Sequence, residues 1–301
     1  MSAHLRHPAC GCSSPHTGAL QTEGSDLVIE LDVRVGDRTL HAYDTGPDAS
    51  ARLALVWHHG SPQTGAPLEP LLAAAAARGI RLISYGRPGY GGSTSRPGRD
   101  VASAAGDVAA IADALDLEWF AVMGASGGGP HALACAALLP DRVVGAVTLA
   151  GLAPYTEEFD WFAGMTSPGA LHAAREGRDA RERFAETDDF DPEQFLPADW
   201  AALEGNWASL DADVGRSEAF GPGGLIDDDV AFASPWGFEL EAIRPPVLLV
   251  QGEHDRVVPA KHASWMLSRI RRAQLWMRLD DGHVSVLDVV PDAMDWLLQR
   301  G

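Results

Sequence analysis

The sequence has little positive charge. Lys261 is its only lysine, and 23 basic residues are set against 42 acidic ones in 301 residues, which gives a net charge of −19. Proteins that bind nucleic acid or anionic lipid use Lys and Arg to neutralise phosphates. We therefore expect no nucleic-acid partner and no membrane partner. Three cysteines are also too few for a disulfide framework.

Long apolar runs and a secretion signal are missing as well. The longest apolar stretch, residues 143–154, falls short of the roughly 18 residues that a membrane-spanning helix needs, and it indicates a buried strand and its exit. Residues 1–26 have no apolar signal core, so we expect them to form a flexible N-terminal tail and expect the protein to be cytoplasmic. Cys10 and Cys12 lie there near histidines, but their C-x-C spacing is not that of a structural zinc site. We expect no metal and no organic cofactor.

From residue 27 onward, apolar strand-like segments alternate with helix-like ones. This alternation predicts an α/β fold with a mostly parallel, twisted sheet and helices on both faces. Gly36-Asp37 joins the first two strands as a hairpin. The expected strands are 27–35, 38–43, 53–57, 80–84, 119–123, 143–149, 247–251 and 274–279, and the expected helices are 68–78, 101–115, 130–139, 260–270 and 291–300.

The alternation stops between residues 155 and 236. This segment contains no clear strand, and it holds four of the nine Trp and seven of the nine Phe. It also contains nineteen acidic and five basic residues, a net charge of −14, whereas the rest of the chain is close to balanced. A shift in composition of this size indicates a mainly helical insertion into the α/β core.

The most specific motif is Gly124-Ala125-Ser126-Gly127-Gly128, which lies between an expected strand and an expected helix. A serine on such a tight turn has a strained backbone that lifts its hydroxyl clear of the sheet, and glycines two residues away on each side avoid steric overlap. The helix N-terminus also aims amides at the serine. A phosphate-binding loop is excluded, since Gly-Lys-Ser/Thr is absent. The motif predicts that Ser126 is a nucleophile.

This strand, serine turn and helix resemble the nucleophile elbow of the α/β-hydrolase family, and the resemblance extends over about residues 27–300. It implies the α/β-hydrolase fold with a cap inserted over the active-site mouth. The expected organisation is a tail (1–26), a core (27–154), a cap insertion (155–236) and the rest of the core (237–301). In this family the nucleophile precedes an acid, and a histidine follows.

The resemblance implies Asp255 as the acid and His283 as the base. Asp255 lies in the loop after the strand at 247–251, with Glu253 as the second choice, and the other position used in the family, residues 150–153, offers no carboxylate. His283 is the only one of eleven histidines that follows the last strand. A serine needs such a base within hydrogen-bond reach, oriented by a carboxylate.

His58-His59-Gly60-Ser61-Pro62 follows the strand at 53–57 and resembles the oxyanion loop of the family. The resemblance implies that the backbone N–H groups of Ser61 and Gly127 stabilise the oxyanion. The Ser61 hydroxyl either contacts the substrate or caps a turn. The loop at residues 86–93 resembles a structural loop of the family, and we expect no catalytic role for it.

The aromatic residues of the insertion suggest an apolar pocket, although large aromatics more often pack a cap against the sheet. The candidates are Trp161, Phe162, Trp200, Trp207 and Phe220. The insertion's carboxylates, including Asp188, Asp189 and Asp227–Asp229, either repel anionic substrates at the entrance or lie on its outer face.

Hydrolysis of a small, largely apolar ester through an acyl-serine is the favoured activity, with a small molecule as the partner. A serine in place of an elbow aspartate disfavours epoxide and haloalkane chemistry, and haloperoxidase-like members commonly have Met where this chain has Gly127. An aminopeptidase, a lactonase or a carbon–carbon bond hydrolase would use the same residues. A non-catalytic small-ligand receptor is the alternative from another class. The oligomeric state is not legible in the sequence.

Overall fold

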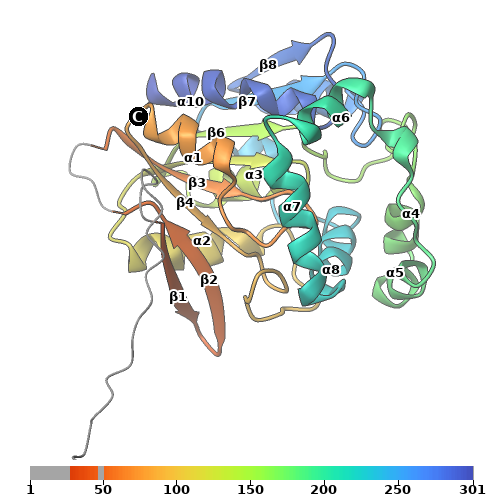
Figure 1. Ribbon diagram of the computed structural model, residues 1–301, viewed down its shortest axis with the longest axis horizontal. Helices are drawn as coiled ribbons and strands as arrows, with labels where there is room; N and C mark the ends of the chain where they lie inside the picture. Colours follow the sequence, from red (N-terminus) through yellow and green to blue (C-terminus); the bar gives the residue numbers. More distant parts are fainter. Residues whose placement is uncertain (1–27, 47–50, 301) are drawn as a thin grey trace, which may run out of the picture.

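The computed structural model describes residues 28–46 and 51–300, and an eight-stranded sheet runs through the core (Figure 1). The strands follow the spatial order β1-β2-β4-β3-β5-β6-β7-β8. Their bounds are β1 Ile29–Val35, β2 Arg38–Asp44, β3 Leu53–His58, β4 Ile80–Tyr85, β5 Phe120–Ala125, β6 Val143–Leu149, β7 Val247–Gly252 and β8 Ala273–Arg278.

The sheet is parallel except at one edge. β1 and β2 form the expected hairpin, with Val35 paired to Arg38, and β2 pairs with β4 in the antiparallel sense. All later pairs, from β4–β3 to β7–β8, are parallel. Every residue of β5 and of β7 is buried, which explains why these strands appear in the sequence as continuous apolar runs instead of alternating patterns.

Helices cover both faces of this sheet. α1 (Glu69–Ala76) and α10 (Val290–Leu298) pack together on one face, and the apolar cluster there includes Leu71 and Trp296. α2 (Ser103–Ala114), α3 (Gly128–Leu138) and α9 (Lys261–Arg269) contribute to the cluster on the other face, which includes Ile111. The predicted fold class is confirmed.

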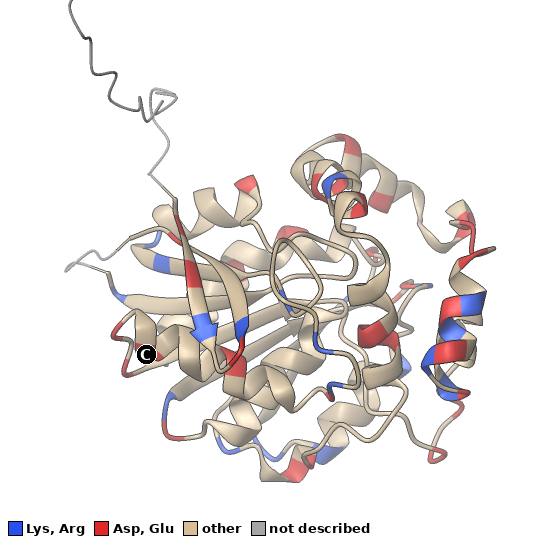
Figure 2. Ribbon diagram, turned by 90° about the horizontal axis from the view of Figure 1, so that it is seen from below, with Lys and Arg blue, Asp and Glu red and all other residues tan. Residues whose placement is uncertain are grey.

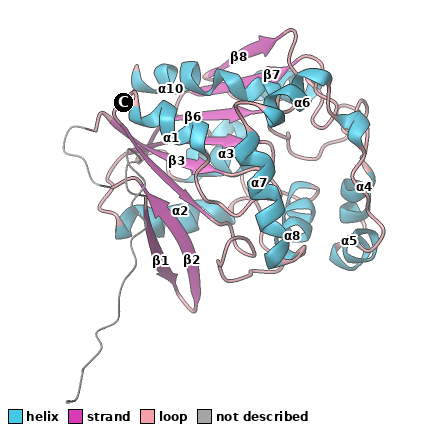
Figure 3. Cartoon of the chain, viewed as in Figure 1, coloured by secondary structure: helices cyan, strands magenta, loops and turns pink. Residues whose placement is uncertain are grey.

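Residues 155–236 connect β6 to β7 through helices and turns, without a strand (Figure 3). The helices lie beside the sheet in Figure 1, with α4 and α5 farthest out. Their bounds are α4 Gly169–Arg175, α5 Arg178–Ala185, α6 Pro197–Glu204, α7 Ala208–Ser217 and α8 Gly223–Phe232. The helices α4, α5 and α8 contact one another, whereas α6 contacts the short turn at Ser285–Val289 that precedes α10.

Two further expectations concern the N-terminal tail and membrane-spanning helices. The N-terminal tail, with Cys10 and Cys12, lies outside the described residues. Among residues 28–46 and 51–300, no helix combines the length and the apolarity that crossing a membrane requires.

Candidate active site

Ser126 occupies the turn between β5 and α3, and its backbone is left-handed, with φ of +50°. Gly124 and Gly128, two residues away on either side, are required by close backbone approaches. A Cβ on Gly124 would overlap the carbonyl oxygen of Gly128, and a Cβ on Gly128 would overlap that of His58. The Ser126 N–H donates to the Leu149 carbonyl oxygen over 2.8 Å, which ties the turn to β6. The sequence motif therefore corresponds to a real steric constraint.

A hydrogen-bonded chain joins three loops at the carboxyl ends of the strands. His283 Nε2 lies 2.9 Å from Ser126 Oγ, and His283 Nδ1 lies 2.8 Å from Asp255 Oδ2. The structure thus brings together the three residues that the sequence analysis predicted. His283 lies 157 positions after Ser126 and 28 positions after Asp255 in the chain. Glu253, the second choice for the acid, is exposed. This arrangement allows His283 to accept a proton from the Ser126 hydroxyl while Asp255 accepts one hydrogen bond from the ring.

Asp255 is held rigidly by donors that the sequence analysis did not identify. Its Oδ1 accepts the backbone N–H groups of Val257 and Val258, each over 2.8 Å. Its Oδ2 accepts a hydrogen bond from Gln251 Nε2 over 3.0 Å in addition to that from His283. Gln251 is the polar residue in the otherwise apolar strand β7, and that exception was a usable signal.

Two carboxylates act on His283. Burial lowers the pKa of its imidazole, but the Asp255 charge and hydrogen bond, with a further contribution from Asp199, outweigh burial and raise the pKa above its ordinary value. Asp280 and Asp281 lie close to His283 in the chain but are not the cause: Asp280 is exposed, and Asp281 pairs with Arg278 over 3.0 Å.

Asp199 was missed by the sequence analysis, although it reaches the His283 loop from α6. Its Oδ1 accepts the N–H groups of Val284 and Ser285 and the Ser285 hydroxyl, over 2.8 to 2.9 Å, and its Oδ2 accepts the Leu196 N–H. Burial favours a higher pKa for Asp199, but these donors hold the pKa below its ordinary value. The 155–236 segment therefore helps to fix the loop that carries His283.

Ser61 and Gly127, the two candidates for the oxyanion hole, also lie side by side. A Cβ placed on Gly127 would be 2.5 Å from Ser61 Oγ and 3.1 Å from Phe232 Cζ, so glycine is the residue that fits there. Among the described hydrogen bonds, the Ser61 hydroxyl makes none within its own turn. It donates to Asp228 Oδ2 over 2.7 Å. Asp228 belongs to α8, so the 155–236 segment also contacts this loop.

The five aromatic pocket candidates occupy three kinds of environment. Trp161 and Trp207 are almost fully buried, and their indole N–H groups donate to the Ala153 carbonyl and to Asp288. Phe162 is half-buried and stacks on His172. Trp200 and Phe220 are exposed. Trp161 and Trp207 thus pack the segment against the core, and Phe232, which was not nominated, lies next to Gly127.

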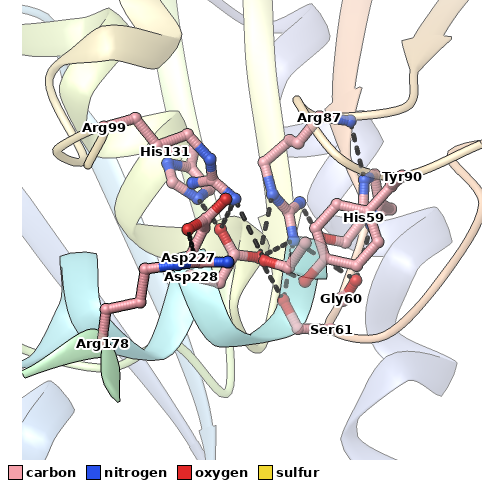
Figure 4. Close-up of polar contacts among 11 residues, drawn as sticks. His59, Gly60, Ser61, Arg87, Tyr90, Arg99, His131, Arg178, Asp227 and Asp228 are labelled. Atoms are coloured by element: carbon pink, nitrogen blue, oxygen red, sulfur yellow. Dashed lines mark hydrogen bonds and ion pairs between the residues drawn. The ribbon is translucent and has the colours of Figure 1, made fainter. Parts of the chain in front are cut away.

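Neither expectation for Asp227–Asp229 is correct, because these carboxylates are buried and paired with arginines. Successive side chains on a helix point about 100° apart, so the three carboxylates of α8 face different partners. Asp229 pairs with Arg181 of α5. Asp227 pairs with Arg178, also of α5, whereas Asp228 faces the core (Figure 4). The flanking Ile226 and Val230 were the available sequence signal for burial.

Most of the other acidic residues of this segment are on the surface. Figure 2 shows acidic and basic residues interspersed along the ribbon at its right-hand edge, where α4 and α5 lie in Figure 1. Asp188 and Asp189 are among the exposed ones, and Asp188 also lies 3.6 Å from Arg181. The segment's excess of negative charge is therefore divided between a solvated surface and five buried, partnered carboxylates: Asp199, Asp213, Asp227, Asp228 and Asp229.

A mostly parallel sheet with a serine on a strained strand-to-helix turn, hydrogen-bonded to a histidine and through it to an aspartate, defines the hydrolases of the α/β class. A family model described as alpha/beta hydrolase fold matches residues 54–289, and the chain belongs to that family.

Relatives and solved structures with several activities resemble the chain. It is 28% identical over 239 residues to a non-heme chloroperoxidase of Streptomyces lividans, covering 70% of this chain and 78% of that protein. An esterase from a Rhodococcus species superposes with a TM-score of 0.69 at 24% identity, covering 91% of this chain and 99% of that one. The enol-lactonase of Burkholderia xenovorans gives 0.68 at 20% identity, covering 89% and 100%. These likenesses establish a hydrolase fold and leave the substrate open.

Proposed function

We propose that the protein is a serine hydrolase that cleaves a small, largely apolar carboxylic ester through an acyl-serine intermediate. The observation that carries the proposal is the chain of hydrogen bonds from Ser126 through His283 to Asp255, at 2.9 and 2.8 Å. A serine hydroxyl is a poor nucleophile unless an oriented base takes its proton as it attacks.

In the proposed reaction, Ser126 Oγ attacks the ester carbonyl carbon while His283 Nε2 takes the hydroxyl proton. The carbonyl π electrons move to the oxygen, and the backbone N–H groups of Ser61 and Gly127 stabilise the resulting oxyanion. When the tetrahedral intermediate collapses, the bond to the leaving alkoxide breaks and His283 donates its proton to that oxygen. A water molecule, activated by the same histidine, then releases the carboxylic acid and restores Ser126.

Residues 155–236 form the cap in this proposal, between core segments 27–154 and 237–301. Phe232 is buried and packs next to Gly127, so the turn that carries Ser126 has an apolar neighbour. Phe162, Trp200 and Phe220 stay candidates for further contacts with the substrate. An aminopeptidase, a lactonase, a carbon–carbon bond hydrolase and a small-ligand receptor are the alternatives, and no contact in the described residues favours one of them over an ester hydrolase.

A labelling and turnover experiment tests the proposal. We expect a fluorophosphonate probe to modify Ser126 stoichiometrically, as mapped by peptide mass spectrometry, and we expect a series of neutral aryl esters of increasing acyl length to be hydrolysed over many turnovers. Labelling with at most one slow turnover would support the receptor instead. Turnover of amides or lactones at rates well above those of every ester would replace the ester assignment, and absence of labelling at Ser126 would refute the mechanism.

The pH dependence provides a separate prediction. His283 must be neutral to act as the base, and its pKa in the folded protein lies above the ordinary value of about 6.5 because Asp255 outweighs burial. We therefore expect kcat/KM for a neutral ester to rise with pH and to reach half its plateau above pH 6.5. Intrinsic fluorescence at each pH serves as the control for unfolding. A flat profile between about pH 5 and 8 would contradict a histidine base.

A further inference from the structure

One buried carboxylate of α8 links the 155–236 segment to the oxyanion loop. The Asp228 side chain is fully buried and lies at the centre of the group of side chains in Figure 4. Its Oδ2 accepts hydrogen bonds from Arg87 Nη2 at 2.7 Å, from Tyr90 at 2.8 Å and from the Ser61 hydroxyl at 2.7 Å. Its Oδ1 lies 2.7 Å from Arg99 Nη2 and 3.2 Å from His131 Nε2.

The carboxylate is ionised in this setting. Burial favours a higher pKa for Asp228, but the guanidinium groups of Arg87 and Arg99 hold the pKa well below its ordinary value. The neighbouring His131 is neutral, since burial lowers its pKa to about 4. Displacing a buried charge with this many donors is costly, because it leaves charged groups without a partner.

Arg87 extends this geometry along the oxyanion loop. Its Nη2 donates to the Ser61 hydroxyl over 2.7 Å, and its Nη1 donates to the His59 carbonyl oxygen. Its backbone N–H donates to His59 Nε2 over 3.1 Å, and the other ring nitrogen of His59 lies 2.6 Å from the Gly60 carbonyl oxygen. Asp228 and Arg87 together thus hold residues 59–61 by both backbone and side chain.

The end of this network lies at the two amides assigned to the oxyanion. The Ser61 hydroxyl occupies the space next to Gly127, 2.5 Å from the position of a Cβ on that glycine. Asp228 itself contacts neither Gly127 nor Ser126 among the described contacts. Its effect on the site therefore passes through Ser61 and Arg87.

We propose that Asp228 is a positioning residue for the oxyanion hole: it fixes the Ser61 backbone amide through the Ser61 hydroxyl and Arg87. The proposal rests on the function proposed above. It makes the 155–236 segment a part of the catalytic framework, because the aspartate comes from α8 and the loop from the core. Donors that are placed before the reaction stabilise an oxyanion without a reorganisation cost, so a small displacement is expensive.

Two substitutions and a control test this role. Ser61→Ala removes the hydroxyl, keeps the backbone amide and changes no charge. Asp228→Asn removes the charge that organises the cluster. Asp227→Asn is the matched control, since Asp227 is the adjacent carboxylate of the same helix, is also buried and pairs with Arg178 instead of the loop. Thermal unfolding of each variant reports on folding.

We expect kcat to fall about 10-fold in Ser61→Ala and about 30- to 100-fold in Asp228→Asn, with KM within about threefold of wild type. The reason is that losing an oxyanion donor outright lowers kcat by about 10²- to 10³-fold, whereas displacing the donor lowers kcat less. An aryl boronic acid, which forms a tetrahedral adduct with the serine, should bind more weakly by the same factors. Asp227→Asn should keep kcat and boronate affinity within about threefold even where its melting temperature falls.

Several outcomes would overturn the proposal. Folded Ser61→Ala and Asp228→Asn enzymes with wild-type kcat would do so, as would an Asp227→Asn enzyme that loses as much kcat as Asp228→Asn, since the effect would then be one of stability. Where Asp228→Asn does not fold, Ser61→Ala decides. The proposed function can be refuted separately. A wild-type protein that does not react with fluorophosphonate refutes both proposals. A wild-type protein that reacts and hydrolyses esters, with Ser61→Ala and Asp228→Asn variants that keep wild-type kcat, refutes only the role of Asp228.

Discussion

Ser126→Ala should lower kcat for a neutral aryl ester by about 10³-fold or more, with the fold intact. The Ser126 Oγ atom lies 2.9 Å from His283 Nε2, and no other described side chain makes a hydrogen bond with that nitrogen. Alanine has the same Cβ as serine, so the left-handed turn at φ of +50° keeps its backbone. The oxyanion amides also stay in place, which leaves the variant able to bind esters while nearly inactive. Steady-state kinetics measure the loss of kcat, and fluorophosphonate labelling measures the loss of the reactive hydroxyl.

Ser264→Ala is a suitable control for this variant. Ser264 is an exposed residue of α9 whose hydroxyl donates to the Ala260 carbonyl, away from the site. We expect wild-type kcat and full labelling from it, and equal melting curves for wild type and Ser126→Ala. If Ser126→Ala hydrolyses the ester at the wild-type rate, the assignment of nucleophile, acid and base fails as a whole.

Asp255→Asn should be nearly as damaging, with a loss of about 10³-fold in kcat/KM. The two backbone N–H groups at Oδ1 require an oxygen there, so the amide NH₂ of asparagine would take the place of Oδ2 and face His283 Nδ1. Nδ1 would then have to accept a hydrogen bond, and the ring proton would move to Nε2. In that tautomer the histidine cannot take the proton of Ser126.

Glu253→Gln provides the matched comparison, because Glu253 lies in the same loop but is exposed. Its kcat/KM should equal that of wild type. The tautomer itself can be checked directly by NMR of the His283 ring nitrogens, which should show the proton on Nδ1 in wild type and on Nε2 in Asp255→Asn. A large loss in Glu253→Gln together with a mild effect of Asp255→Asn would reverse the assignment of the acid.

The residues of the site differ in how far the sequence alone could predict them. Ser126 could be predicted as the nucleophile because its signal is local: the strand, Gly124, Gly128 and the helix are contiguous, and the steric overlaps that demand glycine involve the same turn and the adjacent strand end. Asp255 and His283 required the family resemblance, since neither an Asp nor a Gly-His loop is distinctive by itself. Asp199, Gln251 and Asp228 were missed because each acts through contacts with segments far away in the chain.

The carboxylates of the 155–236 segment illustrate the same difference most clearly. Composition shows an excess of acidic residues, and from composition alone every aspartate counts as one negative surface charge. The fold separates them: α8 directs Asp228 to Arg87, and α6 directs Asp199 to the His283 loop, both buried, while Asp188 and Asp189 stay in solvent. Net charge is additive along a chain, but burial and pairing depend on which helix face meets which loop.

By itself, then, the sequence determined the class of fold, the order of the strands along the chain and the identity of the serine turn, because apolar periodicity and turn chemistry act over a few neighbouring residues. Only the tertiary structure decided that Ser126, His283 and Asp255 lie within hydrogen-bond distance and that the 155–236 segment is attached to the site by buried carboxylates. Those contacts join residues up to 167 positions apart, as between Ser61 and Asp228. Their geometry is set by how the sheet brings the carboxyl ends of its strands to one edge, which no local pattern specifies.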